Sequence, residues 1–316
     1  MNPLLTKLQP YPFERLKQLF LSDTPNPALS PISLGIGEPK HATPEFIKTA
    51  LSGALDGLAA YPATAGTPQL RNAFAAWMQR RYGLSVDANA QVLPVNGSRE
   101  ALFAFTQVIV DPTKTTSKAG VTQLPIVVCP NPFYQIYEGA ALLAGAEPYY
   151  VNSDPARNFG VDWDSVPAAI WERTQMIFVC SPGNPAGAVM PLDEWKKLFA
   201  LSERYGFVIA SDECYSEIYF QDGVPPPLGG LEAAHKLGNK EFKNIVSFTS
   251  LSKRSNVPGM RSGFCAGDAA IMKQFALYRT YHGSAMSLVV QAASTAAWND
   301  EAHVVANRDL YRDKFM

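Results

Sequence analysis

Residues 244–264 read NIVSFTSLSKRSNVPGMRSGF, in which two apolar runs flank a polar turn. Ile245–Thr249 is a short apolar run, which is typical of a strand that is covered on both faces. A polar turn with Lys253 follows, and a second apolar run comes at Gly263–Ala266. Ligands of open α/β sheets bind beyond the carboxyl ends of the strands, so Lys253 stands where a ligand site is expected.

Apolar runs of this kind recur along the chain, and helical patterns separate them. The predicted strands are Val92–Val95, Ile126–Cys129, Glu147–Val151, Met176–Cys180, Phe207–Ser211, Ile245–Thr249 and Gly263–Ala266. The predicted helices are Ser98–Val108, Tyr134–Ala144, Leu192–Tyr205, Ile271–Tyr281, Leu288–Trp298 and Asn307–Phe315. Alternation of strand and helix predicts a wound α/β domain with a mostly parallel sheet.

The composition is that of a globular protein. Of the 316 residues, 47% are hydrophobic and 17% are charged, and the net charge of −1 gives no bulk attraction for nucleic acid or an anionic membrane. The proline-rich N-terminus lacks the apolar core of a secretory signal, and no segment approaches the roughly 20 apolar residues of a membrane span. We therefore expect a cytoplasmic protein, with its four cysteines mostly small buried residues.

Lys253 lies in the turn SLSKR at residues 250–254. Burial at a strand end disfavours the protonated amine, and so does a nearby cation, for which Arg261 is the candidate. Both effects make the amine a better nucleophile toward an aldehyde. The hydroxyls of Ser250 and Ser252 and the forked donors of Arg261 suit a phosphate. Taken alone, a lysine at a strand end is more often a solvated surface residue.

Two other strand ends supply polar side chains. Asp212, in SDECY at residues 211–215, ends an apolar run, and a carboxylate at that depth needs a positive partner such as a protonated pyridine nitrogen. Asn184, in SPGNPAG at residues 181–187, stands in a loop stiffened by glycine and proline, where its amide can serve a phenolate-type oxygen. Helix capping by Asp212 and ordinary turn chemistry around Asn184 are the structural alternatives.

A fourth candidate is VNGSRE at residues 95–100, where a strand leads directly into a helix. Gly97 lets the backbone approach a ligand closely, and the amides of Ser98 and Arg99 would face an anion at the helix N-terminus. An ordinary helix cap, with Ser98 as the capping residue, explains the same pattern equally well.

Other chemistries find no support in the sequence. GIG at residues 35–37 begins like a dinucleotide-binding fingerprint, but Lys40 occupies the place of the third glycine. We expect no metal, because no close pair or zinc motif is formed by the four histidines His41, His235, His282 and His303.

In their order and spacing, these motifs resemble the class I/II aminotransferases of the fold-type-I pyridoxal-phosphate enzymes. The resemblance runs from about Leu34 to the end of the chain and rests on SPGNPAG, SDECY and SLSKRSNVPGMR together. It implies a mostly parallel seven-stranded sheet in an α/β/α large domain, and pyridoxal 5'-phosphate as the cofactor. The expected domains are residues 41–285 for the large domain, 1–40 for an N-terminal part of a small domain, and 286–316 for the start of its truncated C-terminal part.

The resemblance also implies a role for each matching residue. Lys253 would hold the cofactor as a Schiff base and then move the proton between the substrate α-carbon and the cofactor. Asp212 would pair with the pyridine nitrogen, Asn184 and Tyr215 would bond the phenolic oxygen, and Tyr134 would stack on the ring. The phosphate would be held by Gly97, Ser98, Arg99, Ser250, Ser252 and Arg261, and by Tyr61 of the neighbouring subunit in a homodimer.

The substrate is less well defined. Gly37 matches a glycine that contacts the substrate carboxylate, and Asn184 is the second expected substrate contact. No residue of this sequence matches the family's arginine for the α-carboxylate, so the matching residues predict cofactor binding. LQPYPFERL at residues 8–16 and the segment 131–151 are similar to bacterial succinyldiaminopimelate aminotransferases of lysine biosynthesis, with 2-oxoglutarate as the acceptor. Arg99, Lys40 and Arg254 are candidate cations for an acidic substrate. A pyridoxal-phosphate lyase catalysing β-elimination and a non-catalytic binding module are the alternatives.

Overall fold

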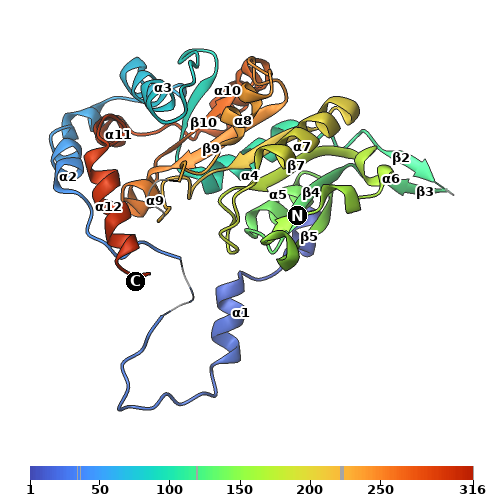
Figure 1. Cartoon of the computed structure of the whole chain (residues 1–316), viewed down its shortest axis with the longest axis horizontal. Helices are drawn as coiled ribbons and strands as arrows, with labels where there is room; N and C mark the ends of the chain where they lie inside the picture. The colour runs from blue at the N-terminus through green and yellow to red at the C-terminus, as the bar shows by residue number, and fades with distance from the viewer. Residues whose placement is uncertain (34, 36, 119, 221–223, 316) are drawn as a thin grey trace.

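The computed structural model describes residues 1–33, 35, 37–118, 120–220 and 224–315. Within these residues, one sheet of eight strands lies at the centre, in the order β1-β10-β9-β8-β7-β4-β5-β6. Its strands are β1 Val92–Val95, β4 Ile126–Asn131, β5 Glu147–Asp154, β6 Gly160–Val161, β7 Thr174–Cys180, β8 Val208–Asp212, β9 Ile245–Ser250 and β10 Gly263–Gly267. A separate hairpin, formed by β2 Thr116–Lys118 and β3 Val121–Gln123, projects from one end of the molecule (Figure 1).

The sheet confirms the mostly parallel α/β architecture. All seven strands that the apolar runs predict are present, and the five neighbours β5, β4, β7, β8 and β9 run parallel. β10 lies antiparallel between β9 and β1. The sheet has one strand more than predicted, because the two residues of β6 pair with the end of β5 and are too short to form a periodic pattern.

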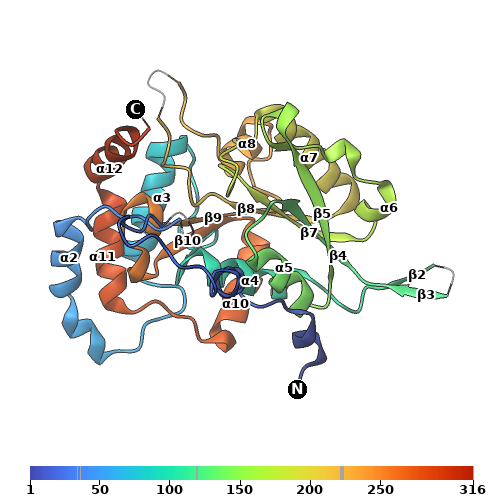
Figure 2. The same cartoon turned by 90° about the horizontal axis from the view of Figure 1, so that it is seen from below.

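Helices cover both faces of the sheet (Figure 2). Side chains of β8 alternate between the two cores, since Ile209 enters one and Val208 and Ala210 enter the other. One face is covered by α2 Glu45–Ser52, α3 Pro68–Tyr82, α7 Leu192–Tyr205, α8 Gly230–Lys236 and α11 Leu288–Asn299. The other face is covered by α4 Ser98–Ile109, α5 Ile136–Leu143 and α10 Ala269–His282. The remaining helices are α1 Pro12–Leu19, α6 Ala168–Trp171, α9 Leu251–Arg254 and α12 Ala302–Arg312, with 3₁₀ turns η1 Pro3–Lys7, η2 Leu55–Ala59, η3 Pro155–Arg157, η4 Trp163–Ser165 and η5 Pro258–Met260.

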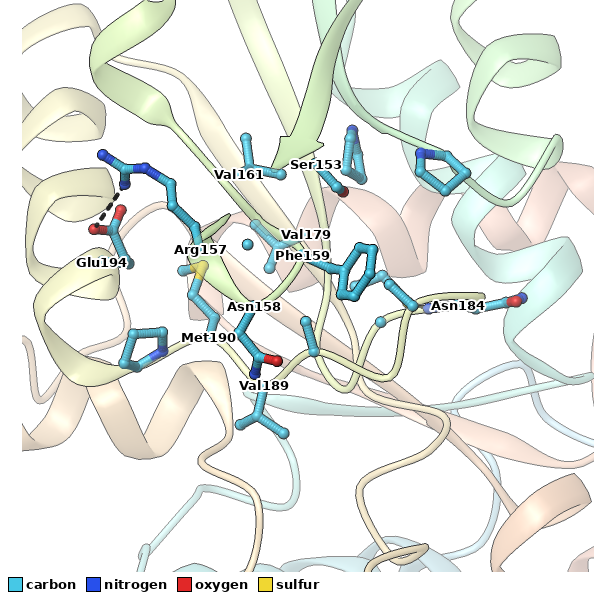
Figure 3. Close-up of a pocket in the computed structure, with 18 of the residues that line it drawn as sticks. Ser153, Arg157, Asn158, Phe159, Val161, Val179, Asn184, Val189, Met190 and Glu194 are labelled. Carbon is cyan, nitrogen blue, oxygen red and sulfur yellow. Dashed lines mark hydrogen bonds and ion pairs between the residues drawn. The ribbon is translucent and has the colours of Figure 1, made fainter. Parts of the chain in front are cut away.

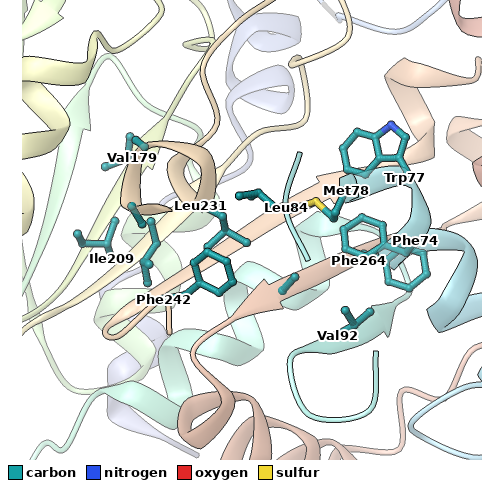
Figure 4. Packing of buried hydrophobic residues seen from close by; sticks show 14 of the residues in the cluster. Phe74, Trp77, Met78, Leu84, Val92, Val179, Ile209, Leu231, Phe242 and Phe264 are labelled. Carbon is teal, nitrogen blue, oxygen red and sulfur yellow. The ribbon is translucent and has the colours of Figure 1, made fainter. Parts of the chain in front are cut away.

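An aromatic cluster joins α3 to the sheet and to α11. The ring of Phe74 stacks on that of Phe264 of β10, with centroids 4.2 Å apart and an interplanar angle of 9° (Figure 4). Trp298 of α11 meets both rings edge-on, and Trp77 packs against it at 4.8 Å. Burial of such rings contributes several kcal/mol to stability by area, so α11 is firmly attached to this core.

The N-terminal segment differs from the rest of the chain. Neither η1 nor α1 buries a residue, and after α1 the chain loops away from the sheet (Figure 1). This agrees with the absence of an α/β pattern before about residue 40. Among the described residues, no helix combines the length and apolar character needed to span a membrane.

Candidate active site

The strand ends meet in one cavity of about 670 Å³. Because β1, β4, β7, β8 and β9 point the same way, the residues that follow them gather at a single edge of the sheet. Of the predicted site residues, all but Gly97 and Tyr61 line this cavity: Gly37, Ser98, Arg99, Tyr134, Asn184, Asp212, Tyr215, Ser250, Ser252, Lys253 and Arg261. Residues separated by up to 224 positions in the sequence are thus brought together around one ligand-sized space (from Gly37 to Arg261).

Lys253 presents its amine to this cavity from α9, the short helix that follows β9. Burial lowers the pKa of Lys253, and nearby Cys214 and Glu38 oppose this effect. The Nζ atom donates a hydrogen bond to the backbone carbonyl of Gly37 and lies 5.7 Å from the ring centroid of Tyr215. A half-buried amine with a lowered pKa is a better nucleophile than a solvated lysine, so the surface alternative does not hold.

Asp212 ends β8 deep in the same cavity, where its side chain is buried. Its Oδ2 accepts a hydrogen bond from the hydroxyl of Tyr137 at 2.8 Å, and its Oδ1 accepts one from the backbone N–H of Cys214 at 3.3 Å. Burial nevertheless raises the pKa of Asp212. Both donors are uncharged, so among the described residues the carboxylate has no positive partner of the kind that its depth calls for, and it does not cap a helix.

Tyr137 is a site residue that the sequence analysis missed. It is fully buried on α5, and its ring stacks on Phe178 of β7 with centroids 4.2 Å apart. The stacking fixes the direction of its hydroxyl toward Asp212. The signal that could have found it is its place in the same aromatic segment as Tyr134, just before α5, because the two ring centroids lie 5.9 Å apart.

The N-terminus of α4 forms an anion site with Arg261. Gly97 is the N-cap with φ 87°, and no side chain caps the helix, so Ser98 does not act as the cap that the alternative required. A Cβ at Gly97 would lie 2.1 Å from a terminal nitrogen of Arg261. A side chain at this position would therefore displace the guanidinium from beside these amides, and the positive φ of Gly97 itself favours glycine.

Serine hydroxyls complete this anion site. Ser250 donates to the hydroxyl oxygen of Ser252 at 2.9 Å, and Arg261 lies 3.5 Å from the same oxygen. The hydroxyl of Ser98 accepts a hydrogen bond from the thiol of Cys214 at 3.0 Å, which ties the α4 turn to the strand end at Asp212. Helix amides, hydroxyls and a guanidinium on one wall fit a phosphate group.

Asn184 stands in a loop that is closed by its own hydrogen bonds. Gly183 N donates to Ala188 O at 2.8 Å and Gly187 N donates to Gly183 O at 2.7 Å. Asn184 lines both the first cavity and a second one of about 390 Å³, and this second cavity is lined largely by apolar side chains (Figure 3). The Asn184 side chain points away from Phe159 and Met190 in that view. Turn chemistry therefore shapes the loop that carries Asn184.

Arg99 lies in the cavity without a carboxylate partner in the part of the chain that the structure describes. Its guanidinium donates to the hydroxyls of Tyr134 and Tyr11, the latter at 3.2 Å. Tyr11, at the start of α1, is a second residue that the sequence analysis missed. The two hydroxyls hold the cation in a fixed place and leave its charge available to an acidic ligand.

The other two candidate cations are placed differently. Arg254 is 2% exposed, and it donates to the carbonyl of Ala297 at 2.8 Å and to Glu301 at 2.7 Å. The prediction that it serves an acidic substrate is therefore wrong, since its donors face the protein interior. Lys40 is exposed and pairs with Glu38 at 2.9 Å.

Two of the predicted contacts involve a neighbouring subunit or a substrate. Tyr61 is fully exposed, outside the cavity, so its contact with a neighbouring subunit stays a prediction. Gly37 lines the cavity, but its carbonyl accepts from Lys253, and its contact with a substrate carboxylate stays a prediction.

The cavity fits the cofactor that the resemblance implies. The anion site at Gly97 and Arg261 suits its phosphate, and the unpartnered Asp212 suits its ring nitrogen. Lys253 and Asn184 face the same space, where an aldehyde and a phenolic oxygen would lie between these two ends.

Comparisons with known proteins agree with this geometry. The family model described as aminotransferase class I and II matches residues 30–316. The LL-diaminopimelate aminotransferase of Desulforudis audaxviator is 31% identical over 98% of this chain and 75% of its own length. The 4-dedimethylamino-4-oxo-anhydrotetracycline transaminase OxyQ of Streptomyces rimosus is 36% identical over 89% of this chain and 70% of its own. The crystal structure of an aminotransferase from Neisseria meningitidis Z2491 superposes with a TM-score of 0.93 at 54% identity, covering 100% of this chain and 77% of that one.

Proposed function

Because the chain belongs to the aminotransferase class I and II family and is a pyridoxal-phosphate-dependent aminotransferase, we propose that it takes its amino group from an acidic donor of the diaminopimelate type. The donor is N-succinyl-L,L-2,6-diaminopimelate or diaminopimelate itself, and 2-oxoglutarate is the acceptor. The observation that carries this proposal is Arg99, a cation held in the cavity by two tyrosine hydroxyls. The names of relatives such as the Desulforudis audaxviator enzyme support the same substrate class.

We propose that the cavity residues predicted from the sequence bind the cofactor and move the substrate proton. When bound, pyridoxal phosphate supplies the electron sink that stabilises negative charge at the substrate α-carbon. Lys253 Nζ would be the atom that holds and moves the proton of that carbon. Asp212 would keep the ring nitrogen protonated, and Tyr134 would stack on the ring. The phosphate would be held by Gly97, Ser98, Arg99, Ser250, Ser252 and Arg261, and the phenolic oxygen by Asn184 and Tyr215.

We also propose a homodimer, in which Tyr61 reaches the phosphate of the neighbouring subunit. The complete exposure of this tyrosine supports a role outside its own chain. We propose that residues 41–285 form the large domain, and that residues 1–40 and 286–316 belong to a small domain. We also propose that Gly37 and Asn184 contact the substrate.

A survey of single half-reactions tests the proposed function. Purified protein is loaded with pyridoxal phosphate and mixed with one amino donor at a time, and the cofactor absorbance is followed without any oxo acid. We expect the two diaminopimelate donors and glutamate to convert the cofactor to its amine form faster than alanine does. Equal rates for all donors would contradict an acidic specificity. Pyruvate release from a β-substituted donor without an acceptor would favour the lyase alternative.

Replacing Arg99 with glutamine should weaken acidic donors selectively. The guanidinium offers charged donors that an amide lacks, and such hydrogen bonds contribute about 1.5–3 kcal/mol, so the KM for an acidic donor should rise about 10- to 150-fold. The KM for alanine should change little. Steady-state kinetics with both donors measure this, and the variant Lys40→Gln, at an exposed cation outside the cavity lining, is the matched control. Equal losses for both donors would mean that Arg99 serves the cofactor alone.

A further inference from the structure

The helix that carries Lys253 is too short to be stable without contacts from the rest of the protein. α9 has four residues, Leu251–Arg254, and a single helical turn is unstable in isolation. Ser250 caps its start by accepting a hydrogen bond from Ser252 N at 3.1 Å. Its last carbonyls have no partner within the helix and must be satisfied from elsewhere. The direction of the Lys253 side chain therefore depends on what binds these carbonyls.

We infer that Asn307 of α12 is a positioning residue, which fixes the direction of Lys253 through the backbone of α9. The inference rests on the proposed role of Lys253 as the reactive amine. The Nδ2 atom of Asn307 donates to the carbonyl of Lys253 at 3.1 Å and to that of Arg254 at 3.4 Å. One buried amide, 54 residues away in the sequence, thus satisfies both terminal carbonyls of α9.

The other end of the Asn307 amide is held as firmly. Its Oδ1 accepts a hydrogen bond from Asn256 Nδ2 at 2.7 Å and lies 3.2 Å from His41 Nδ1. The backbone carbonyl of Asn256 in turn accepts from the hydroxyl of Thr43 at 2.9 Å. Because the oxygen is engaged in this way, the NH₂ group must face α9, and the amide cannot flip without losing these contacts.

A second contact from α12 reinforces the same segment. His303, one turn before Asn307, lies 2.8 Å from the hydroxyl of Ser255 and 2.6 Å from Asp300 Oδ1. Serine, histidine and aspartate are thus aligned as in a hydrolase triad. Ser255 is fully buried and lines no part of the active-site cavity, so no substrate reaches its hydroxyl. The array therefore fastens the residue that caps the end of α9 to α12.

The contacts of α12 explain why the amine of Lys253 lies where it does. The backbone of α9 is bound from the side of α12, and the Nζ atom is bound from the other side by the carbonyl of Gly37. This arrangement keeps the amine half-buried, and burial lowers the pKa of Lys253. If α9 could turn, the flexible lysine stem would bring the amine into solvent, and its pKa would return toward the ordinary value.

The variant Asn307→Asp tests this inference, because it keeps the size of the side chain and the oxygen that faces Asn256 but removes the two donors to α9. At pH 8, where an aspartate is ionised, we expect kcat to fall about 10- to 100-fold with KM changed less than about twofold, as for a misplaced reactive group. Val305→Ala, on the exposed side of α12, is the control and should keep its activity.

Titration of the Lys253 amine in the cofactor-free protein is a readout that does not depend on catalysis. Acetic anhydride is applied at graded pH, and peptide mass spectrometry gives the extent of acetylation at Lys253 and at the exposed Lys236. The pKa of Lys253 should lie below its ordinary value of 10.5 in the native protein and rise toward it in Asn307→Asp, with Lys236 unchanged. An unchanged titration together with an unchanged kcat would overturn the inference.

Folding and the proposed function are controlled separately. If Asn307→Asp does not fold, Asn256→Ala removes one contact that orients the Asn307 amide, and it should shift both readouts in the same direction by a smaller amount. No shift in either readout for a folded Asn256→Ala would also overturn the inference. If Lys253→Ala instead retains the cofactor absorbance, the proposed role of Lys253 fails, whatever the acetylation experiment shows for Asn307.

Discussion

Lys253→Ala protein is expected to lose transamination by about 10⁴-fold or more and to lose the absorbance of lysine-bound cofactor. The reason is that in the proposed mechanism one atom, Nζ, both attaches the cofactor and moves the α-proton, and general acid–base catalysis alone is worth about 10²–10⁴-fold. No other lysine lines the described cavity, so none can replace it at the strand end. The loss is measured by absorbance spectra and by single-turnover rates with glutamate.

Two further variants test whether Lys253 acts by attaching the cofactor or only by its positive charge. Lys253→Arg keeps a cation at the site but offers no amine that can attach the cofactor, so it should be as inactive as alanine. Lys236→Ala removes an exposed lysine that pairs with Glu232 on α8 and should keep full activity. If Lys253→Ala retained both the absorbance band and the activity, the proposed role of Lys253 would be wrong.

Much of the fold could be predicted because its strands are buried on both faces. Such strands appear in the sequence as continuous apolar runs, and the strand from Val92 to Val95 has all four residues buried, as its sequence predicts. β6 was missed because two residues carry no periodicity. The position of the site followed for the same reason, since residues after parallel strands meet at one edge of the sheet, and Asp212 and Lys253 both stand there.

The remaining part of the site depends on side-chain direction, which the sequence does not contain. Lys253 and Arg254 are neighbours on α9, yet one amine enters the cavity and one guanidinium enters the core, because successive residues on a helix point to different sides. Tyr137 and Asn307 act through hydrogen bonds to groups that lie far away in the sequence. Their roles became visible only when packing had fixed the relative positions of α5, α12 and the strand ends.

Asp212→Asn is expected to have opposite effects on function and on stability. Turnover should fall at least about 100-fold, because a neutral amide cannot hold the ring nitrogen of the cofactor in its protonated form. The cofactor-free protein should nevertheless unfold at a higher temperature, since a buried carboxylate without a positive partner is costly when ionised. A catalytic group that destabilises its own fold is a recognised trade-off.

The pH dependence gives the sign of this stability effect. Burial raises the pKa of Asp212 in the folded protein above the value of 3.8 for a free side chain, so the folded state binds this proton more tightly than the unfolded state does. The protonated Asp212 side chain therefore stabilises the folded state fully when the pH is below the pKa of the unfolded chain. This stabilisation is lost as the pH rises through the pKa of Asp212 in the folded protein. Asparagine does not titrate, so the Tm advantage of Asp212→Asn should be small at pH 4 and should grow to about 2 °C or more at pH 8.

Calorimetry of the cofactor-free proteins at pH 4, 6 and 8 measures this difference, and Asp309→Asn, at an exposed aspartate on α12, is the control for removal of a carboxylate. Addition of pyridoxal phosphate should then reverse the order. The native protein gains a positive partner for Asp212 and is stabilised by ligand binding, whereas the variant gains less because it binds the cofactor more weakly. A variant that is less stable than the native protein at pH 8 without cofactor would show that the hydrogen bond from Tyr137 outweighs the burial of the charge at Asp212.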